Sequence, residues 1–185
     1  MNHPEKILRT LDAYLAKETR LILYGRAALA LGFSHSQPDF HSTLDVDAIL
    51  PEVEMAMIDE DDQFWTAIEK TNDKLKSSGL YITHLFTESQ VILSPSWLDQ
   101  IEPIKFLGLQ YLQPFRPSVS DLIQKKMMRI DPQDRSDIEF LLSHLDLSTR
   151  QIEELIATAR VPEITEIKVA FEKNSHWLFE KFSEV

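Results

Sequence analysis

The sequence predicts an α+β fold in which a small mixed β-sheet is flanked by helices and followed by a C-terminal helical subdomain. Short apolar runs of strand length, bounded by glycine or proline, occur only before residue 117. Apolar residues spaced three and four apart open the chain and then dominate it from Ser118 onward. We therefore expect an α+β core over residues 1–117 and a helical subdomain, packed on this core, over residues 118–185.

The composition excludes several classes of function. The chain has no cysteine, which excludes disulfides, thiolate metal sites and catalysis by a cysteine nucleophile. Nineteen basic residues against thirty acidic ones give a net charge of -11, which disfavours a long contact with nucleic-acid phosphates. No segment approaches the roughly 20 apolar residues that span a membrane, and the first residues lack the apolar centre of a signal peptide. We expect a cytoplasmic protein with no membrane partner.

The first half of the core alternates between helical and strand patterns. An amphipathic pattern at the start predicts a helix that ends near Lys17. The apolar run that follows stops at Gly25, and helix-forming residues then continue to Gly32, a typical helix end. Pro51 ends the next apolar run. After the first helix, the predicted elements are a strand over 21–24, a helix over 26–32, a loop over 34–42 and a strand over 43–50.

The rest of the chain is predicted in the same way. Asp61 or Asp62 is expected to cap a helix that Gly79 ends. Apolar runs predict strands over 80–86 and 90–94, joined in a hairpin, and a further strand or pair of strands over 104–115. In the helical subdomain we expect helices over 118–130, 132–145, 148–160 and 163–182, with cap residues Ser118 or Ser120, Asp131 and Ser148.

Two carboxylates stand one residue apart in the segment "HSTLDVDAIL". Side chains two apart on a strand project from the same face, so Asp45 and Asp47 are expected to point the same way. Two like charges at this spacing need a cation, a proton or solvent to compensate them. Either the pair binds a divalent metal such as Mg²⁺, or it lies in water on the outer face of an edge strand. The residues alone leave both interpretations open.

A helix start lies just before this strand. Gly25 and Arg26 follow the strand over 21–24, and the exposed N–H groups of a helix N-terminus favour phosphate. The alternative is an ordinary turn between a strand and a helix. The order of glycine, helix and paired aspartates shifts the balance toward a site that binds metal and phosphate.

The segments "LILYGRAALALGF" and "HSTLDVDAIL" together resemble the nucleotidyltransferase superfamily with a polymerase-β-like fold. Within it they are similar to AbiEii-type or minimal nucleotidyltransferases of bacteria and archaea. The positions that match the family pattern are Gly25, Thr43, Asp45 and Asp47. A second resemblance to the helical signature of that group lies in "SVSDLIQKKMMRIDPQDRSDIEFLL", where the matching residues are Asp121, Lys126, Arg129, Asp134 and Asp137.

The resemblance implies a Mg²⁺-dependent transfer of a nucleotidyl group from an NTP to an acceptor hydroxyl. Asp45 and Asp47 would be the catalytic carboxylates that bind one or two Mg²⁺ ions. The residues expected to contact substrate are Gly25, Arg26, Thr43 and Lys126. Acceptors in the group include tRNA ends, proteins and small molecules. Many members belong to toxin–antitoxin or defence pairs, which implies a cognate toxin or antitoxin as a partner.

An alternative follows from a carboxylate that the sequence does not supply. Members of the superfamily generally use a third acid from a neighbouring strand, whereas the segment "LYITHLF" offers Thr83 and His84 and no acid. The alternative is therefore a catalytically degenerate protein of this fold that binds a nucleotide or a partner protein. A structural module with no nucleotide site is the least favoured interpretation, because it requires two resemblances in the proper order to be coincidence.

Overall fold

The chain folds into two compact units in the computed structural model, which describes residues 1–105 and 107–183. The first, which we call the sheet unit, comprises Met1–Thr87 and Ile101–Arg116. The second, the helical unit, comprises Glu88–Gln100 and the chain from Pro117 onward. The segment Glu88–Gln100 thus leaves the sheet unit between two of its strands and belongs to the helical unit.

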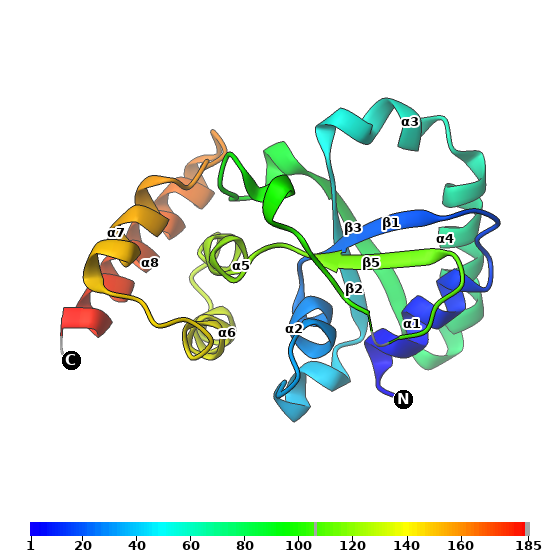
Figure 1. Cartoon of the computed structure of the whole chain (residues 1–185), viewed down its shortest axis with the longest axis horizontal. Helices are drawn as coiled ribbons and strands as arrows, with labels where there is room; N and C mark the ends of the chain where they lie inside the picture. The colour runs from blue at the N-terminus through cyan, green and yellow to red at the C-terminus, as the bar shows by residue number, and fades with distance from the viewer. Residues whose placement is uncertain (106, 184–185) are drawn as a thin grey trace. The chain divides into compact units, whose positions relative to one another are not determined.

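A mixed five-stranded sheet forms the centre of the sheet unit (Figure 1). Its strands are β1 (Thr19–Leu23), β2 (Asp45–Leu50), β3 (Tyr81–Thr87), β4 (Glu102–Pro103) and β5 (Leu112–Arg116). Their order is β3-β2-β1-β5-β4, with β1–β2 and β4–β5 antiparallel and β1–β5 and β2–β3 parallel. The predicted α+β class with a small mixed sheet is confirmed.

The described part of the sheet unit contains four α-helices, and the two longest of them bury apolar residues and begin at side-chain caps. The four helices are α1 (His3–Asp12), α2 (Arg26–Gly32), α3 (Met55–Asp59) and α4 (Asp62–Leu75). Helix α1 buries Ile7, Leu8 and Leu11, and α4 begins where Asp61 accepts the N–H of Phe64, as predicted. Helix α1 ends at Asp12 rather than near Lys17. Short 3-10 turns lie at Pro38–Ser42, Glu52–Glu54, Lys76–Ser78, Glu88–Gln90 and Trp97–Gln100.

The hairpin predicted between residues 80–86 and 90–94 is wrong. Strand β3 continues to Thr87 and a 3-10 turn follows, after which Leu93 forms only an isolated bridge with Arg160. The apolar residues of this run are buried in the helical unit, and a short apolar run fits a strand and an irregular core segment equally well. Between residues 104 and 115, the strand pattern is confirmed only over β5. Phe106 lies outside the described residues.

The helical unit contains α5 (Val119–Lys126), α6 (Pro132–Leu142), α7 (Thr149–Ala157) and α8 (Thr165–Ser183). Three of these helices begin at the predicted caps, because the side chains of Ser118, Asp131 and Ser148 accept backbone N–H groups of the first turn. Apolar side chains such as Ile123 and Leu141 are fully buried. None of the described helices combines the length and the apolar character that crossing a lipid bilayer requires.

Candidate active site on strand β2

Asp45 and Asp47 lie on an interior strand of the sheet. Strand β2 pairs with β1 on one side and with β3 on the other, so the interpretation as an edge strand is wrong. Val46 between them is fully buried, whereas both aspartates are partly exposed, which agrees with two carboxylates on one strand face. Charged side chains are uncommon on interior strands, so this face of β2 is the candidate site.

Each aspartate is held by a neighbouring hydroxyl group. The hydroxyl of Thr43 donates to Oδ1 of Asp45 over 2.9 Å. The hydroxyl of Thr83, on β3, donates to Oδ1 of Asp47 over 2.8 Å. His84 adds its Nδ1 atom at 3.2 Å from the same oxygen. Thr43, one of the positions that match the family pattern, therefore lies beside the first carboxylate.

Gly25, between β1 and α2, lies against the carboxylate of Asp47. Gly25 is the N-cap residue of α2, and a Cβ atom built on it would lie 2.8 Å from Oδ2 of Asp47. That separation is shorter than side-chain atoms tolerate, so a larger residue at position 25 would have to displace the Asp47 side chain. The backbone supports this approach, because the N–H of Tyr24 donates to the carbonyl oxygen of Asp47 over 3.2 Å. Gly25 and Asp47, both residues of the predicted site, are thus neighbours in the structure.

Arg26 and Lys126 have surroundings of different kinds. The guanidinium carbon of Arg26 lies 5.3 Å from the centre of the Phe40 ring, a cation–π contact at the start of α2. Lys126 belongs to the helical unit and is only 4% exposed. Its Nζ atom lies 2.9 Å from Asp134 and 2.5 Å from Asp137, both buried. The charge of Lys126 therefore has two carboxylate partners within its own unit.

The ion pairs with Lys126 and Arg129 lower the pKa of Asp134. Burial of its carboxyl group acts to raise the pKa, but the charges of Lys126, Arg129 and Lys125 outweigh burial and hold the pKa below the ordinary value. The second segment of the family resemblance thus forms two buried ion pairs between α5 and α6, from Lys126 to Asp134 and Asp137, and a third pair from the exposed Arg129 to Asp134.

The described residues contain no group of three or more His, Asp or Glu side chains arranged to hold a metal ion. Mg²⁺, however, typically takes only one or two protein carboxylates and completes its shell with waters and substrate phosphates. Asp45 and Asp47 supply that number of hard oxygen ligands. Glu88, the next acid after β3, pairs instead with Arg160 at 3.3 Å in the helical unit. The residues present therefore fit one Mg²⁺ bound together with a triphosphate.

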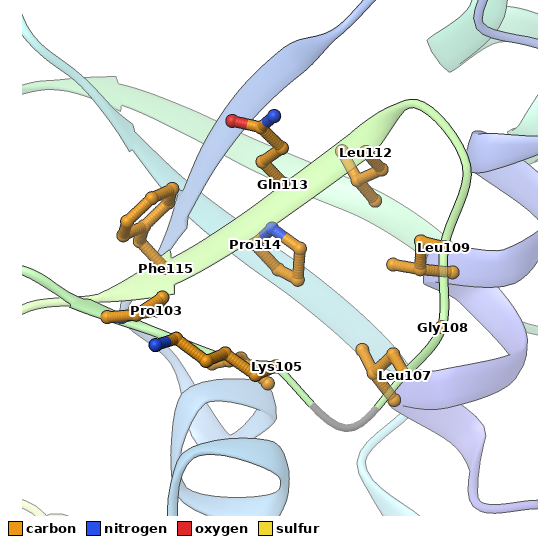
Figure 2. A pocket seen from close by; sticks show the side chains of 10 residues that line it. Pro103, Lys105, Leu107, Gly108, Leu109, Leu112, Gln113, Pro114 and Phe115 are labelled. Carbon is orange, nitrogen blue, oxygen red and sulfur yellow. The ribbon is translucent and has the colours of Figure 1, made fainter.

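A separate cavity lies beside β5 in the sheet unit (Figure 2). Its volume is about 260 Å³, and the side chains around it are mostly apolar, among them Leu107, Leu112 and Pro114. Lys105 brings the one charge among its described lining residues, which include neither Asp45 nor Asp47. The cavity offers no acid for phosphate chemistry, so the candidate site is the carboxylate face of β2.

A comparison with protein families decides the class. The family described as "Nucleotidyltransferase of unknown function (DUF6036)" matches residues 5–182. The chain belongs to this family. The match spans the strand with Asp45 and Asp47 and also the helices with the ion pairs, and it confirms the predicted nucleotidyltransferase superfamily. Searches of curated proteins and of solved structures found no match.

Membership in a nucleotidyltransferase family implies a nucleotide substrate. Within this DUF6036 chain, Gly25, Thr43, Asp45 and Asp47 form the candidate active site. The sequence identified Thr83 and His84 only as the residues that stand where a third acid was expected. Their contacts with Asp47 were missed because the register of β2 against β3 decides them, and no local pattern encodes that register.

Proposed function

We propose that the chain is a Mg²⁺-dependent nucleotidyltransferase that moves a nucleotidyl group from an NTP to an acceptor hydroxyl. The observation that carries the proposal is the position of Asp45 and Asp47 on one face of an interior strand, with the carboxylate of Asp47 against the glycine that opens α2. The same face belongs to a chain of a nucleotidyltransferase family.

Asp45 and Asp47 would hold the metal ion, which when bound neutralises triphosphate charge and polarises the reacting phosphate. The groups around them orient the carboxylates: Thr43 beside Asp45, and Thr83 with His84 beside Asp47. Gly25 leaves room for the triphosphate to approach the carboxylate of Asp47.

The transfer itself requires no covalent enzyme intermediate. The oxygen of the acceptor hydroxyl forms a bond to the α-phosphorus while the bond from that phosphorus to the bridging oxygen breaks. Pyrophosphate leaves with this oxygen, and the hydroxyl proton passes to solvent. The task of the chain is to position the reactants and compensate charge, which is how enzymes generally catalyse phosphoryl transfer.

We extend the proposal to the finer class and partners that the sequence resemblance implies. These are an AbiEii-type enzyme, an acceptor that is a tRNA end, a protein or a small molecule, and a cognate toxin or antitoxin. Arg26, beside Gly25, is proposed to contact the triphosphate. The contact of Lys126 with substrate stays a prediction, and its two buried ion pairs support a structural role.

A second candidate function has an observation of its own in its favour. Strand β3, the neighbour of the two aspartates, presents Thr83 and His84 where the superfamily generally has a third acid. This arrangement favours a chain that binds a nucleotide without turning it over. The two functions share the metal–nucleotide site and differ only in the transfer.

Binding is tested by thermal unfolding. Mg²⁺ with an NTP should raise the melting temperature of the wild-type protein, because a ligand that binds only the folded state stabilises it by mass action. The variant with Asp45→Asn and Asp47→Asn should show no such increase. Asp73→Asn, an exposed position on α4, is the matched control and should respond as wild type does. A wild-type protein without a metal-dependent increase would contradict both functions.

Catalysis is tested by transfer of label from an NTP labelled at the α-phosphate. Candidate acceptors are total tRNA, protein extracts and small hydroxyl compounds. Transfer by the wild type that is lost in the double aspartate variant supports the enzyme. Metal-dependent binding without transfer to any acceptor class supports the degenerate binding protein.

A further inference from the structure

We infer that Thr83 and His84 are positioning residues that fix the carboxylate of Asp47, so that its Oδ2 atom alone is left for a metal ion. This inference rests on the proposed function and deepens it. It assigns a task to the two residues that stand where a third acid is expected.

A β-bulge in β3 brings both residues to the same aspartate. Val46 is opposite Ile82 and Ala48 is opposite Leu85, so the single residue Asp47 faces two residues of β3. A bulge adds one residue to one strand and re-aims side chains locally. The extra residue in β3 is what allows two adjacent side chains to reach one carboxylate.

The two contacts converge on one oxygen atom. Thr83 Oγ1 donates to Asp47 Oδ1 over 2.8 Å, and His84 Nδ1 lies 3.2 Å from it. With Nδ1–H as the donor, both contacts occupy the lone pairs of Oδ1. The torsion that turns a carboxylate about its last bond is broad, so without these donors the two oxygens of Asp47 would exchange places.

The histidine ring is held by more than this contact. It stacks on Phe86 with 5.1 Å between ring centres and an angle of 6° between their planes. Phe86 in turn meets the ring of Tyr24 edge to face at 5.9 Å. The side chain of His84 is 58% exposed, yet this stack restrains the ring against rotation. The donor to Asp47 is therefore preorganised.

The other oxygen of Asp47 is left open by a glycine. Oδ2 faces Gly25, where a Cβ atom would lie 2.8 Å away, and within residues 1–105 and 107–183 no hydrogen bond to Oδ2 is formed. The Asp47 side chain is 18% exposed, so solvent reaches it. Thr83 and His84 occupy Oδ1 of Asp47, and Gly25 places no side chain beside Oδ2. Oδ2 is therefore the atom of Asp47 that is left to bind a metal ion.

Metal affinity tests the inference directly. The probe is Mn²⁺, whose free concentration is followed by its paramagnetic resonance signal in the presence of a non-hydrolysable NTP analogue. The double variant Thr83→Val with His84→Phe removes both donors while Phe preserves a ring to stack on Phe86. We expect it to raise the dissociation constant of Mn²⁺ about 10- to 100-fold, as loss of groups that orient metal ligands generally does.

Conservative replacement separates orientation from stability. In the variant His84→Asn the side-chain amide N–H lies near the position of Nδ1. This variant, with Thr83 unchanged, should therefore keep most of the wild-type affinity for Mn²⁺. His176→Phe, an exposed position on α8, is the matched control and should bind Mn²⁺ as wild type does. If the double variant does not fold, Thr83→Val alone still tests the inference, because Thr83 is exposed and valine has nearly the same shape.

Two outcomes would overturn the inference, and they are distinguishable. If wild type and the folded double variant bind Mn²⁺ equally, the two residues only support the bulge, and the proposed function survives. If the wild type binds no Mn²⁺ with the NTP analogue, both the inference and the proposed function fail.

Discussion

The Cα atom of Gly25 faces the carboxylate of Asp47 so closely that a Cβ atom at residue 25 would lie 2.8 Å from Oδ2. Gly25 follows β1 by two residues, and Asp47 lies on the neighbouring antiparallel strand β2. The two meet because Leu23 pairs with Ala48, which brings the end of β1 alongside Asp47. The close approach of this glycine is therefore part of the candidate site and not only of the turn into α2.

Gly25→Ala should damage the site more than the fold. The added methyl group displaces the Asp47 carboxylate, which we expect to cost about 1–3 kcal/mol of unfolding free energy and to abolish metal-dependent stabilisation by NTP. Urea unfolding with and without Mg²⁺ and NTP measures both effects. In the background of Asp47→Ala the same substitution should cost less, because the atom it meets is gone. Equal costs in both backgrounds would contradict this explanation.

Lys126→Met should strongly destabilise the protein. The substitution leaves Asp134 and Asp137 buried without their shared cation, and breaking a buried pair in this way typically costs about 3–5 kcal/mol. Arg129→Met is the comparison, because Arg129 bonds the same Asp134 but is 65% exposed, and we expect a cost of about 1 kcal/mol or less. Denaturant unfolding gives both values. Similar costs would show that burial of the pair is not decisive.

Asp12 should make stability sensitive to acid. Burial acts to raise its pKa, but hydrogen bonds from the backbone N–H groups of Gln110, Leu112 and Tyr111 outweigh burial and lower the pKa below 3.8. A carboxyl group with a lowered folded pKa contributes stability that is complete above the unfolded value. This contribution is lost as pH falls below 3.8, through the folded pKa.

Asp12→Asn should therefore lose about 1–2 kcal/mol near neutral pH, a modest value because the carboxylate is partly exposed. The loss should shrink as the pH falls through the acid range, since the wild type then loses the same contribution. Unfolding free energies measured across that range give the difference. Asp73→Asn, an exposed acid, should show no such trend, and a constant loss at Asp12 would contradict the assignment.

Asp121→Ala should loosen the segment Glu88–Gln100. The fully buried carboxylate accepts the N–H of Ser94 over 2.8 Å and the hydroxyl of Ser118 over 2.6 Å. Without it two partly buried donors lose their partner, and for each of them we expect a cost toward the lower end of about 1–3 kcal/mol. Hydrogen exchange should accelerate at Ser94 and its neighbours. Asp99→Ala, an exposed change in the same segment, should leave exchange unchanged.

Local chemistry explains why many elements could be predicted. Asp61, Ser118, Asp131 and Ser148 accept N–H groups of the helices that follow them, because capping depends only on residues within one turn. The strand with Asp45 and Asp47 was recognisable because its pattern repeats every two residues. These features need no knowledge of the rest of the chain.

Features that depend on distant partners were not predictable. The apolar run around Leu93 looks like a strand, but it does not pair with β3. Instead the backbone N–H of Ser94 donates to the carboxylate of Asp121. Helix α1 ends at Asp12, whose carboxylate binds the N–H groups that lead into β5, about a hundred residues away. Neither partner is visible in a window of local sequence.

The sequence by itself determined the pair of aspartates and the glycine before α2, because residue type and short spacing suffice for these. The nucleotidyltransferase class came from the resemblance of these segments to a known superfamily, which the family match supports. Only the tertiary structure decided that β2 is an interior strand and that Thr83 and His84 both reach Asp47. The physical reason is register: one extra residue in β3 changes which side chains meet, and long-range strand pairing leaves no signature within a single strand.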